Sequence, residues 1–264
     1  MKRVDSHWRL VRNVIRKADV IVEVVDARDP LGTRSQEIEK MADSMGKPLI
    51  IVVNKADLVP KEDVEKWARI LRKERTTVFI SATKRLGTRF LWKILSRTAV
   101  KRPIVVAIVG VPNVGKSTII NYLKGAHSVG TSPIPGYTQH VTRLRVARWL
   151  RVLDTPGVVP RRLGELALVN ALRPESLDDP VPVAVKFLEL IAKKKPHLLK
   201  ELYNIEWKND GILFLEELAR KRGLIGKGGT PLVEEAARIV IRDWQTGKNT
   251  FYLEPEDYGI SANS

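Results

Sequence analysis

The chain has 264 residues and is 44% hydrophobic, enough to bury one large core or two small ones. Cysteine is absent, which excludes disulfides and cysteine-based metal sites. No apolar run approaches the roughly eighteen residues of a membrane span, and the N-terminus lacks the apolar core of a signal peptide. With 46 basic against 30 acidic residues, the net charge is +16. We expect a soluble, cytoplasmic, monomeric protein without a membrane partner.

The first predicted elements are a helix over residues 4–18 and a buried strand over residues 20–25. Apolar side chains recur at helical spacing in the helix, and the opposite face is basic. Its basic residues are Arg9, Arg12, Arg16 and Lys17. After the strand, residues 26–34 read Asp-Ala-Arg-Asp-Pro-Leu-Gly-Thr-Arg, so a charged loop lies at its carboxyl end.

A second buried strand, predicted over residues 49–53, carries the sequence Asn-Lys-Ala-Asp at its carboxyl end. Open α/β sheets bind ligands at that edge. Asn54, Lys55 and Asp57 are therefore candidate nucleotide-binding residues, although alone the tetrad is as typical of a turn. The carboxylate of Asp57 can accept both N1–H and the exocyclic amine of guanine, a pair of donors that adenine does not offer.

The next predicted strand, residues 77–80, delivers Ser81 and Ala82 after a helix over residues 61–74. Their backbone groups are candidates for contact with the guanine carbonyl. A further helix is expected over residues 88–98. These elements continue the alternation of strand and helix that predicts a parallel sheet.

Residues 110–117 read Gly-Val-Pro-Asn-Val-Gly-Lys-Ser, a complete phosphate-binding loop between a strand over 103–109 and a helix over 116–124. Backbone N–H groups and the helix N-terminus would hold phosphate oxygens. Lys116 should reach the β- and γ-phosphates, and the hydroxyl of Ser117 should bind Mg²⁺. The candidate nucleotide-binding residues here are Asn113, Val114, Gly115, Lys116, Ser117 and Thr118.

Two further motifs come after the loop. Thr138, in Pro-Gly-Tyr-Thr, is either a second hydroxyl ligand of Mg²⁺ or an ordinary turn threonine. Strands predicted over residues 140–147 and 149–153 lead to Asp-Thr-Pro-Gly. There Asp154 would hold Mg²⁺ through water, and the N–H of Gly157 would sense the γ-phosphate.

Proline-rich stretches between residues 173 and 182 mark the end of the sheet region, and the pattern beyond them is helical. We predict an α/β domain over residues 1–175 and a small all-helical domain over residues 176–264. The sheet should be mostly parallel and covered on both faces, with one antiparallel edge.

The motif order resembles the circularly permuted GTPases of the YlqF/YawG type, which include nucleostemin and bacterial large-subunit assembly factors. In an ordinary small GTPase the Asn-Lys-x-Asp tetrad comes after the phosphate-binding loop, whereas here it precedes the loop by about fifty residues. The sequence Asp-Ala-Arg-Asp-Pro over residues 26–30 is also similar to a signature of that family. The resemblance implies a circularly permuted Ras-like domain that hydrolyses GTP in ribosome assembly, whereas the residues alone imply a guanine-nucleotide site.

The catalytic residues are less clearly marked. Lys116, Thr138 and Gly157 are candidates through their phosphate and Mg²⁺ contacts. Ras-like enzymes orient the attacking water with a glutamine after the Asp-x-x-Gly motif, but this chain has Val158, so the intrinsic rate should be low.

The family resemblance suggests two substitutes for that glutamine. Asn113 would coordinate an activating K⁺, or it would only stabilise the loop. His7 would match a catalytic histidine that the family carries in a Pro-Gly-His segment. This chain lacks the Pro-Gly there, and a surface histidine is the alternative.

The excess positive charge lies entirely in residues 1–160, which hold 30 basic and 14 acidic residues, against 16 and 16 in residues 161–264. A solvated basic surface is one interpretation. Binding to a polyanion is the other, and ribosomal RNA or a ribosomal subunit suits it better than a membrane. Two functions are therefore considered: a GTPase switch in ribosome assembly, and a GTP-gated RNA-binding module whose hydrolysis is incidental.

We predict that GTP hydrolysis is faster in K⁺ than in Na⁺, because an asparagine in the loop accompanies the missing glutamine. Asn113→Ala should abolish the difference while GTP is still bound. Steady-state hydrolysis rates in matched KCl and NaCl buffers test this, and equal rates for the unaltered protein would contradict it.

Overall fold

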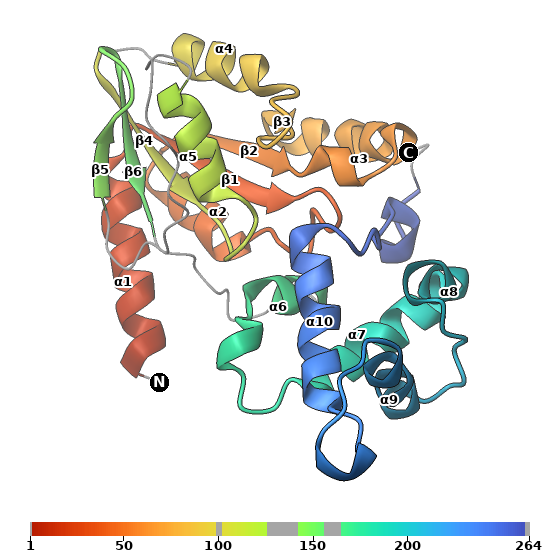
Figure 1. Cartoon of the computed structure of the whole chain (residues 1–264). Coiled ribbons are helices and arrows are strands. Elements are labelled where there is room, and N and C mark those ends of the chain that lie inside the picture. Colours follow the sequence, from red (N-terminus) through yellow and green to blue (C-terminus); the bar gives the residue numbers. More distant parts are fainter. Residues whose placement is uncertain (1, 99–101, 126–141, 156–164, 262–264) are drawn as a thin grey trace. The chain divides into compact units, whose positions relative to one another are not determined.

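The computed structural model describes residues 2–98, 102–125, 142–155 and 165–261. Within these ranges, the side chains of residues 2–7, 142, 165, 167, 168 and 176 are not described. The chain divides into two compact units (Figure 1). Unit 1 comprises Met1–Ala167 and Tyr252–Ser264, and unit 2 comprises Leu168–Phe251.

Unit 1 is built on a six-stranded sheet with the strand order β3-β2-β1-β4-β6-β5. The strands are β1 (Val20–Asp26), β2 (Leu49–Asn54), β3 (Thr77–Phe79), β4 (Ile104–Val109), β5 (Thr142–Arg145) and β6 (Leu150–Asp154). Neighbouring strands are parallel except for β5 and β6, which form an antiparallel hairpin at one edge. The predicted α/β fold with an antiparallel edge is confirmed. β5 ends earlier than predicted because the chain already turns at Val146, whose N–H donates to Leu150.

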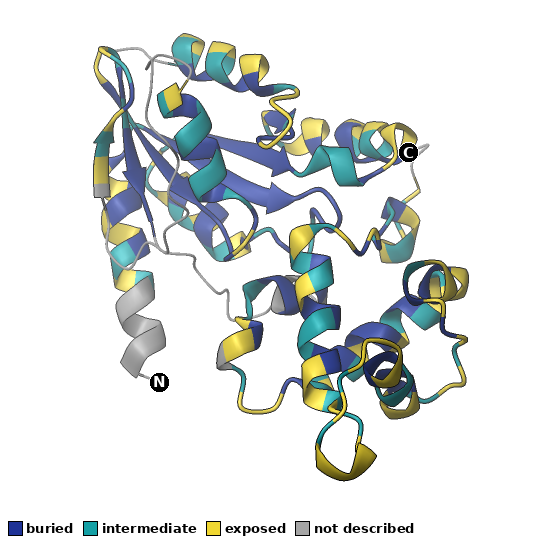
Figure 2. Cartoon of the chain, viewed as in Figure 1, coloured by how far each residue is buried: buried dark blue, intermediate teal, exposed yellow. Residues whose placement is uncertain are grey.

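Helices cover both faces of this sheet. α1 (Lys2–Lys17), α2 (Gln36–Ser44) and α3 (Lys61–Glu74) pack on one face, and α4 (Thr88–Thr98) and α5 (Lys116–Gly125) pack on the other. Within β1, Val22 and Val24 face α4 and α5, whereas Ile21 and Val25 face α1 to α3. Burial on both faces explains why the inner strands β2 and β4 read as nearly continuous apolar runs (Figure 2).

Unit 2 and the residues just before it are helical. The helices are α6 (Glu165–Ala171), α7 (Val181–Lys194), α8 (Pro196–Tyr203), α9 (Gly211–Lys221) and α10 (Val233–Thr246), with short 3-10 turns at Pro174–Ser176 and Lys227–Gly229. The ring of Phe187 meets Trp244 edge-on at 5.9 Å and Phe251 at 6.1 Å between centroids. These rings and the apolar faces of α7, α9 and α10 form the core of unit 2.

The C-terminal segment, residues 252–261, packs on unit 1. The N–H of Leu253 donates to the carbonyl of Arg28 at 2.8 Å, and the indole N–H of Trp67 donates to the carbonyl of Leu253 at 3.1 Å. In the 3-10 turn Pro255–Tyr258, the Tyr258 hydroxyl donates to Asp29 at 2.5 Å. The segment thereby fastens the loop after β1 to α3.

The observed division differs from the predicted boundary at residue 175 in two respects. Unit 2 begins at Leu168, because Gln245 of α10 donates to the carbonyls of Val169 and Leu172 at 2.8 and 2.9 Å. Residues 252–264 were predicted to belong to the helical domain, but they group with unit 1 because of the contacts of Leu253 and Tyr258.

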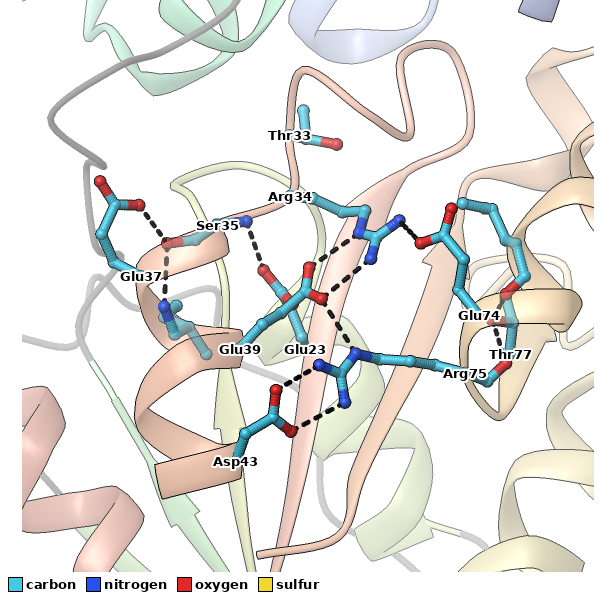
Figure 3. Close-up of polar contacts among 12 residues, drawn as sticks. Glu23, Thr33, Arg34, Ser35, Glu37, Glu39, Asp43, Glu74, Arg75 and Thr77 are labelled. Atoms are coloured by element: carbon cyan, nitrogen blue, oxygen red, sulfur yellow. Dashed lines mark hydrogen bonds and ion pairs between the residues drawn. The ribbon is translucent and has the colours of Figure 1, made fainter. Parts of the chain in front are cut away.

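Glu23 interrupts the apolar run of β1 and lies fully buried beside a network of ion pairs (Figure 3). Its Oε1 accepts the N–H of Ser35 at 2.6 Å, and its Oε2 has no hydrogen-bond partner among the described residues. Burial, together with the negative charge of Glu39, raises the pKa of Glu23 to about 8. The carboxyl group is therefore mostly protonated in the folded protein at neutral pH.

Glu39 is the centre of the neighbouring ion pairs. Arg34 binds both of its carboxylate oxygens at 2.8 and 2.9 Å, and Arg75 binds one of them at 2.9 Å. Arg34 also reaches Glu74 at 2.8 Å, and Arg75 reaches Asp43 at 2.6 Å. The network joins the loop after β1, helix α2 and the end of α3, which holds this side of the sheet together.

We predict that Glu23→Gln flattens the pH dependence of stability. The folded pKa of about 8 exceeds the unfolded value of 4.5, so this contribution to stability is complete below pH 4.5 and is lost as pH rises to 8. The loss should be on the order of 2–4 kcal/mol, since one pKa unit corresponds to about 1.4 kcal/mol. Urea unfolding of the unaltered protein and the variant between pH 5 and 9 measures it.

Glu62→Gln, an exposed charge-matched control on α3, should leave the pH dependence unchanged. Parallel pH profiles for Glu23→Gln and the unaltered protein would contradict the protonated state of Glu23.

Candidate guanine-nucleotide site

The loop between β4 and α5 depends on two glycines. Gly110 has a φ of +141° and Gly115 a φ of +98°, conformations that residues with a side chain rarely adopt. A Cβ atom at Gly110 would lie 2.3 Å from the carbonyl oxygen of Val24, and one at Gly115 would lie 2.2 Å from Nδ2 of Asn54. The loop therefore approaches β1 and β2 too closely for any other residue at these positions.

Lys116, the first residue of α5, is buried beneath the loop. Its Nζ donates to the carbonyl oxygens of Gly110 at 3.0 Å and Val111 at 2.7 Å. Burial lowers the pKa of Lys116 to about 8, although the negative charge of Asp154 acts in the opposite direction. An anion in the loop would favour the charged ammonium, so phosphate binding and protonation of Lys116 should support each other.

Asn54 connects the three motifs predicted to form the site. Its Nδ2 donates to the carbonyl of Val114 in the phosphate-binding loop at 2.8 Å. Its Oδ1 accepts the N–H of Ala82 after β3 at 3.0 Å. The amide is buried, so both bonds are shielded from water. The structure thus brings together segments that lie far apart in the sequence.

Ser81 and Ala82 were predicted to offer backbone groups to the guanine carbonyl. In the structure the N–H of Ser81 donates to Leu86 at 3.0 Å, and the N–H of Ala82 donates to Asn54. Contact between either N–H group and a guanine carbonyl would therefore require one of these bonds to be replaced.

Asp57 lies in a single 3-10 turn, Ala56–Leu58, directly after β2. Its Oδ2 pairs with the ammonium of Lys84 at 3.2 Å, and its buried Oδ1 has no hydrogen-bond partner among the described residues. Burial acts to raise the pKa of Asp57, but hydrogen bonds from Ser81 and Lys84 outweigh it and lower the pKa. An ionised carboxylate oriented in this way suits a ligand with adjacent N–H donors.

The Asp-Ala-Arg segment after β1 holds the lysine of the Asn-Lys-Ala-Asp tetrad. Asp26 is fully buried and lies 2.8 Å from both the guanidinium of Arg28 and the ammonium of Lys55. Burial acts to raise the pKa of Asp26, but these two cations hold it below its usual range. Lys55 itself has a left-handed backbone with φ of +63°. The ion pair with Asp26 therefore fixes the turn that carries Asp57, a role that the sequence did not reveal.

The described part of the predicted Mg²⁺ site consists of Ser117 and Asp154. Asp154 ends β6, where the parallel pairing sets it opposite Ile108 of β4, the strand that leads into the loop. The hydroxyl of Thr155 donates to the carbonyl of Ile108 at 2.7 Å and fixes the chain just after Asp154. Within the described ranges, no three His, Cys, Asp or Glu side chains gather at a metal site. A hydroxyl and one carboxylate, completed by water and phosphate oxygens, fit Mg²⁺ at a nucleotide site.

The other candidate catalytic residues are less fully placed. Thr138 and Gly157 lie outside the described residues. The backbone of His7 lies within α1, which begins at Lys2 and so earlier than predicted, but its side chain is not described. Asn113 is exposed at the tip of the loop, with φ of +60°.

Comparison with known proteins agrees with this geometry. A GTP-binding protein of Methanocaldococcus jannaschii, described as uncharacterised, is 37% identical over 95% of this chain and 68% of its own length. The GNP-bound structure of YlqF from T. maritima superposes with a TM-score of 0.68 and 28% identity, covering 96% of this chain and 99% of that one. A guanine nucleotide-binding protein-like 3 homolog of Caenorhabditis elegans is 34% identical over 98% of this chain and 52% of its own length.

The chain belongs to the circularly permuted GTPases of the YlqF and nucleostemin type. Within this chain, residues 105–218 match the family described as 50S ribosome-binding GTPase, and residues 6–100 match the elongation factor Tu GTP binding domain. The chain spans 52% of the C. elegans relative and 40% of the nucleolar GTP-binding protein 2 of Neurospora crassa, to which it is 37% identical. No helix among the described residues is both long and apolar enough to cross a membrane.

We predict that Asp26→Asn weakens GDP binding by about tenfold or more. The substitution leaves Arg28 and Lys55 as buried cations without a shared carboxylate, so the turn before Asp57 loses its anchor. Titration with a fluorescent GDP analogue measures the affinity, and thermal unfolding without nucleotide shows whether the variant is folded.

Asp43→Asn is the matched control, since it removes the same charge from an exposed pair with Arg75. It should bind GDP as the unaltered protein does. A folded Asp26→Asn variant with unchanged GDP affinity would show that Asp26 does not position Lys55 for nucleotide binding.

Proposed function

We propose that this chain is a Mg²⁺-dependent GTPase switch that acts in assembly of the large ribosomal subunit by binding ribosomal RNA or a ribosomal particle. The observation that carries the proposal is the pair of bonds from Asn54 to Val114 and Ala82, which joins the base-reading turn to the phosphate-binding loop. A single guanine nucleotide spanning these segments accounts for that arrangement. We keep the proposed GTPase domain over residues 1–175 and helical domain over residues 176–264, except that residues 252–264 group with the first.

Nucleotide binding in this proposal uses groups that the structure gathers around the phosphate-binding loop, some of which exchange their present bonds for bonds to the nucleotide. Backbone N–H groups of residues 113–118 take the phosphate oxygens, assisted by the N-terminus of α5. Lys116 exchanges its bonds to Gly110 and Val111 for bonds to the β- and γ-phosphates. The carboxylate of Asp57, which pairs with Lys84 in this structure, accepts hydrogen bonds from N1–H and the exocyclic amine of guanine.

Hydrolysis in this proposal is slow without a partner. Mg²⁺, held by Ser117, Thr138 and, through water, Asp154, would offset negative charge on the phosphates. The ammonium of Lys116 stabilises the same negative charge on the phosphates, and the N–H of Gly157 contacts the γ-phosphate. Because Val158 cannot orient the attacking water, we assign that function to a K⁺ ion at Asn113 or to His7, with the ribosomal particle completing the site.

The charge distribution and the relatives support a ribosomal partner. The whole net charge of +16 arises in residues 1–160, which lie in unit 1. The matching family is described as 50S ribosome-binding, and relatives in Neurospora crassa and Schizosaccharomyces pombe are named nucleolar GTP-binding proteins. A polyanionic partner satisfies both observations.

We predict that purified large ribosomal subunits stimulate GTP turnover by at least about tenfold. The physical reason is that a low intrinsic rate leaves roughly 4–7 kcal/mol of transition-state stabilisation to be supplied in trans, as for other GTPases. Phosphate release with saturating GTP, with and without subunits, measures the effect.

Small subunits and Lys116→Ala are the controls. The former should stimulate little and the latter should abolish turnover in every condition. Turnover that is the same with and without large subunits would favour the GTP-gated binding module over the enzyme.

A further inference from the structure

One continuous stretch of unit 1 is free of acidic residues. Residues 75–153 contain fourteen lysine and arginine residues and no aspartate or glutamate. Acidic residues earlier in unit 1 pair with nearby cations, as Glu39 and Asp43 do with Arg75. Beyond that point the excess charge has no counterpart within the segment itself. Lys84 pairs with Asp57 outside the segment at 3.2 Å, and exposed cations such as Arg89 and Lys93 are available to anions from solvent or from a partner.

Part of this charge surrounds two exposed apolar side chains at the start of α4. Phe90 is 66% exposed and Leu86 is 57% exposed, the two highest values among the large hydrophobic side chains of the described residues. The exposed cations next to them are Lys84, Arg85, Arg89, Lys93 and Arg97. We call these seven residues the α4 patch. Arg89, Lys93 and Arg97 recur every four residues and so lie along one side of the helix.

The turn that presents the patch has a defined structure. Ser81 and Leu86 exchange backbone hydrogen bonds of 3.0 Å in both directions, which closes the chain into a tight hairpin. Gly87 lies so close to β3 that a Cβ atom would meet the carbonyl oxygen of Phe79 at 2.3 Å. Leu86 and Phe90 are therefore held outward by the fold, and Figure 2 shows the exposed residues of α4 on its outer side.

The basic surface continues from α4 to the β5–β6 hairpin. Trp92 of α4 meets Trp149 edge-on, with 5.0 Å between ring centroids. The guanidinium of Arg102 lies over the Trp149 ring at 5.7 Å. Arg145 and Arg148 of the hairpin are exposed beside this contact. A long anion could therefore track cations from the α4 patch to the hairpin.

We propose that the α4 patch binds unpaired RNA, with a base stacked on Phe90 and the neighbouring phosphates paired with Arg89 and Lys93. This inference rests on the proposed action on ribosomal RNA and adds its location and chemistry. Exposed aromatic rings interleaved with cations are what single-stranded nucleic acid requires, because stacking tolerates any base and the cations track the backbone. A protein partner fits less well, since five cations, two of them lysines, crowd two apolar side chains, whereas the centres of protein interfaces are depleted in lysine and in charged residues overall.

Binding of a fluorescein-labelled mixed-sequence 12-nucleotide RNA to the full chain with GDP tests the patch, with anisotropy as the readout. Phe90→Ala should weaken binding by about fivefold or more, because it removes the ring on which a base stacks. Phe90→Trp keeps an aromatic ring and should stay within about twofold of the unaltered protein. A double variant, Arg89→Gln with Lys93→Gln, should weaken binding and reduce the slope of log K against log[salt] by about 1.4.

Two controls match these changes on unit 2. Leu213→Ala removes an apolar side chain that is 50% exposed, and Lys186→Gln with Lys193→Gln removes the same charge from α7. Both should bind the RNA as the unaltered protein does. GTP turnover without RNA should be unchanged in Phe90→Ala, since Phe90 takes no part in the nucleotide site.

The outcomes separate this inference from the proposed function. RNA binding that is equal in Phe90→Ala and the unaltered protein would show that the α4 patch is not the RNA-binding surface. The proposed action on RNA would then depend on another part of the chain. No binding by the unaltered protein to this RNA or to large-subunit RNA would overturn both. If Phe90→Ala keeps RNA binding but loses binding to RNA-free ribosomal proteins, the patch is a protein-docking surface and the RNA assignment is wrong.

Discussion

The side-chain amide of Asn54 lies at the end of β2 and bonds to segments that come directly after β3 and β4. Its donor and its acceptor are both used, and the group is buried. Leaving either side unsatisfied would cost about 1–3 kcal/mol, so the three segments are stable only when all are correctly placed. The glycine at position 115 allows the loop to approach this amide, and a Cβ atom there would displace it. The nucleotide site is in this sense a property of the assembled sheet.

That dependence explains how the chain order can be permuted without loss of the site. β1 lies between β2 and β4, so the base-reading and phosphate-binding segments come from strands on either side of one central strand. Asp26 at the end of β1 completes the arrangement by pairing with Lys55 of the neighbouring strand end. These contacts run across the sheet and are independent of which strand comes first. The permutation instead alters the path of the chain beyond β6, where it leaves unit 1 and later returns to it at Tyr252.

Unit 1 uses its charged residues in two different ways. In its first part, carboxylates such as Asp26 and Glu39 lie buried between cations and hold loops and helices together. The part from residue 75 to residue 153 contains no acidic residue, and many of its cations are exposed. The first arrangement serves the fold and the second leaves a positive surface for a partner. The two can coexist because the buried ion pairs lie around the loop after β1, α2 and the end of α3, whereas the exposed cations of the α4 patch lie on α4 and the turn before it.

The sequence by itself determined the α/β class, the positions of the strands and the permuted order of motifs. Continuous β-branched runs mark strands buried on both faces, and a phosphate-binding loop needs its glycines and lysine at fixed spacing. The tertiary structure decided which groups meet across strands. The pairing of Asp26 with Lys55, the burial of Glu23 and the packing of residues 252–261 on unit 1 join residues that no local pattern connects. Of these, only the burial of Glu23 had a sign in the local sequence, because a glutamate stands in an otherwise apolar strand. Local patterns report backbone conformation and burial, whereas the partner of a buried charge is set by which strands and helices pack side by side.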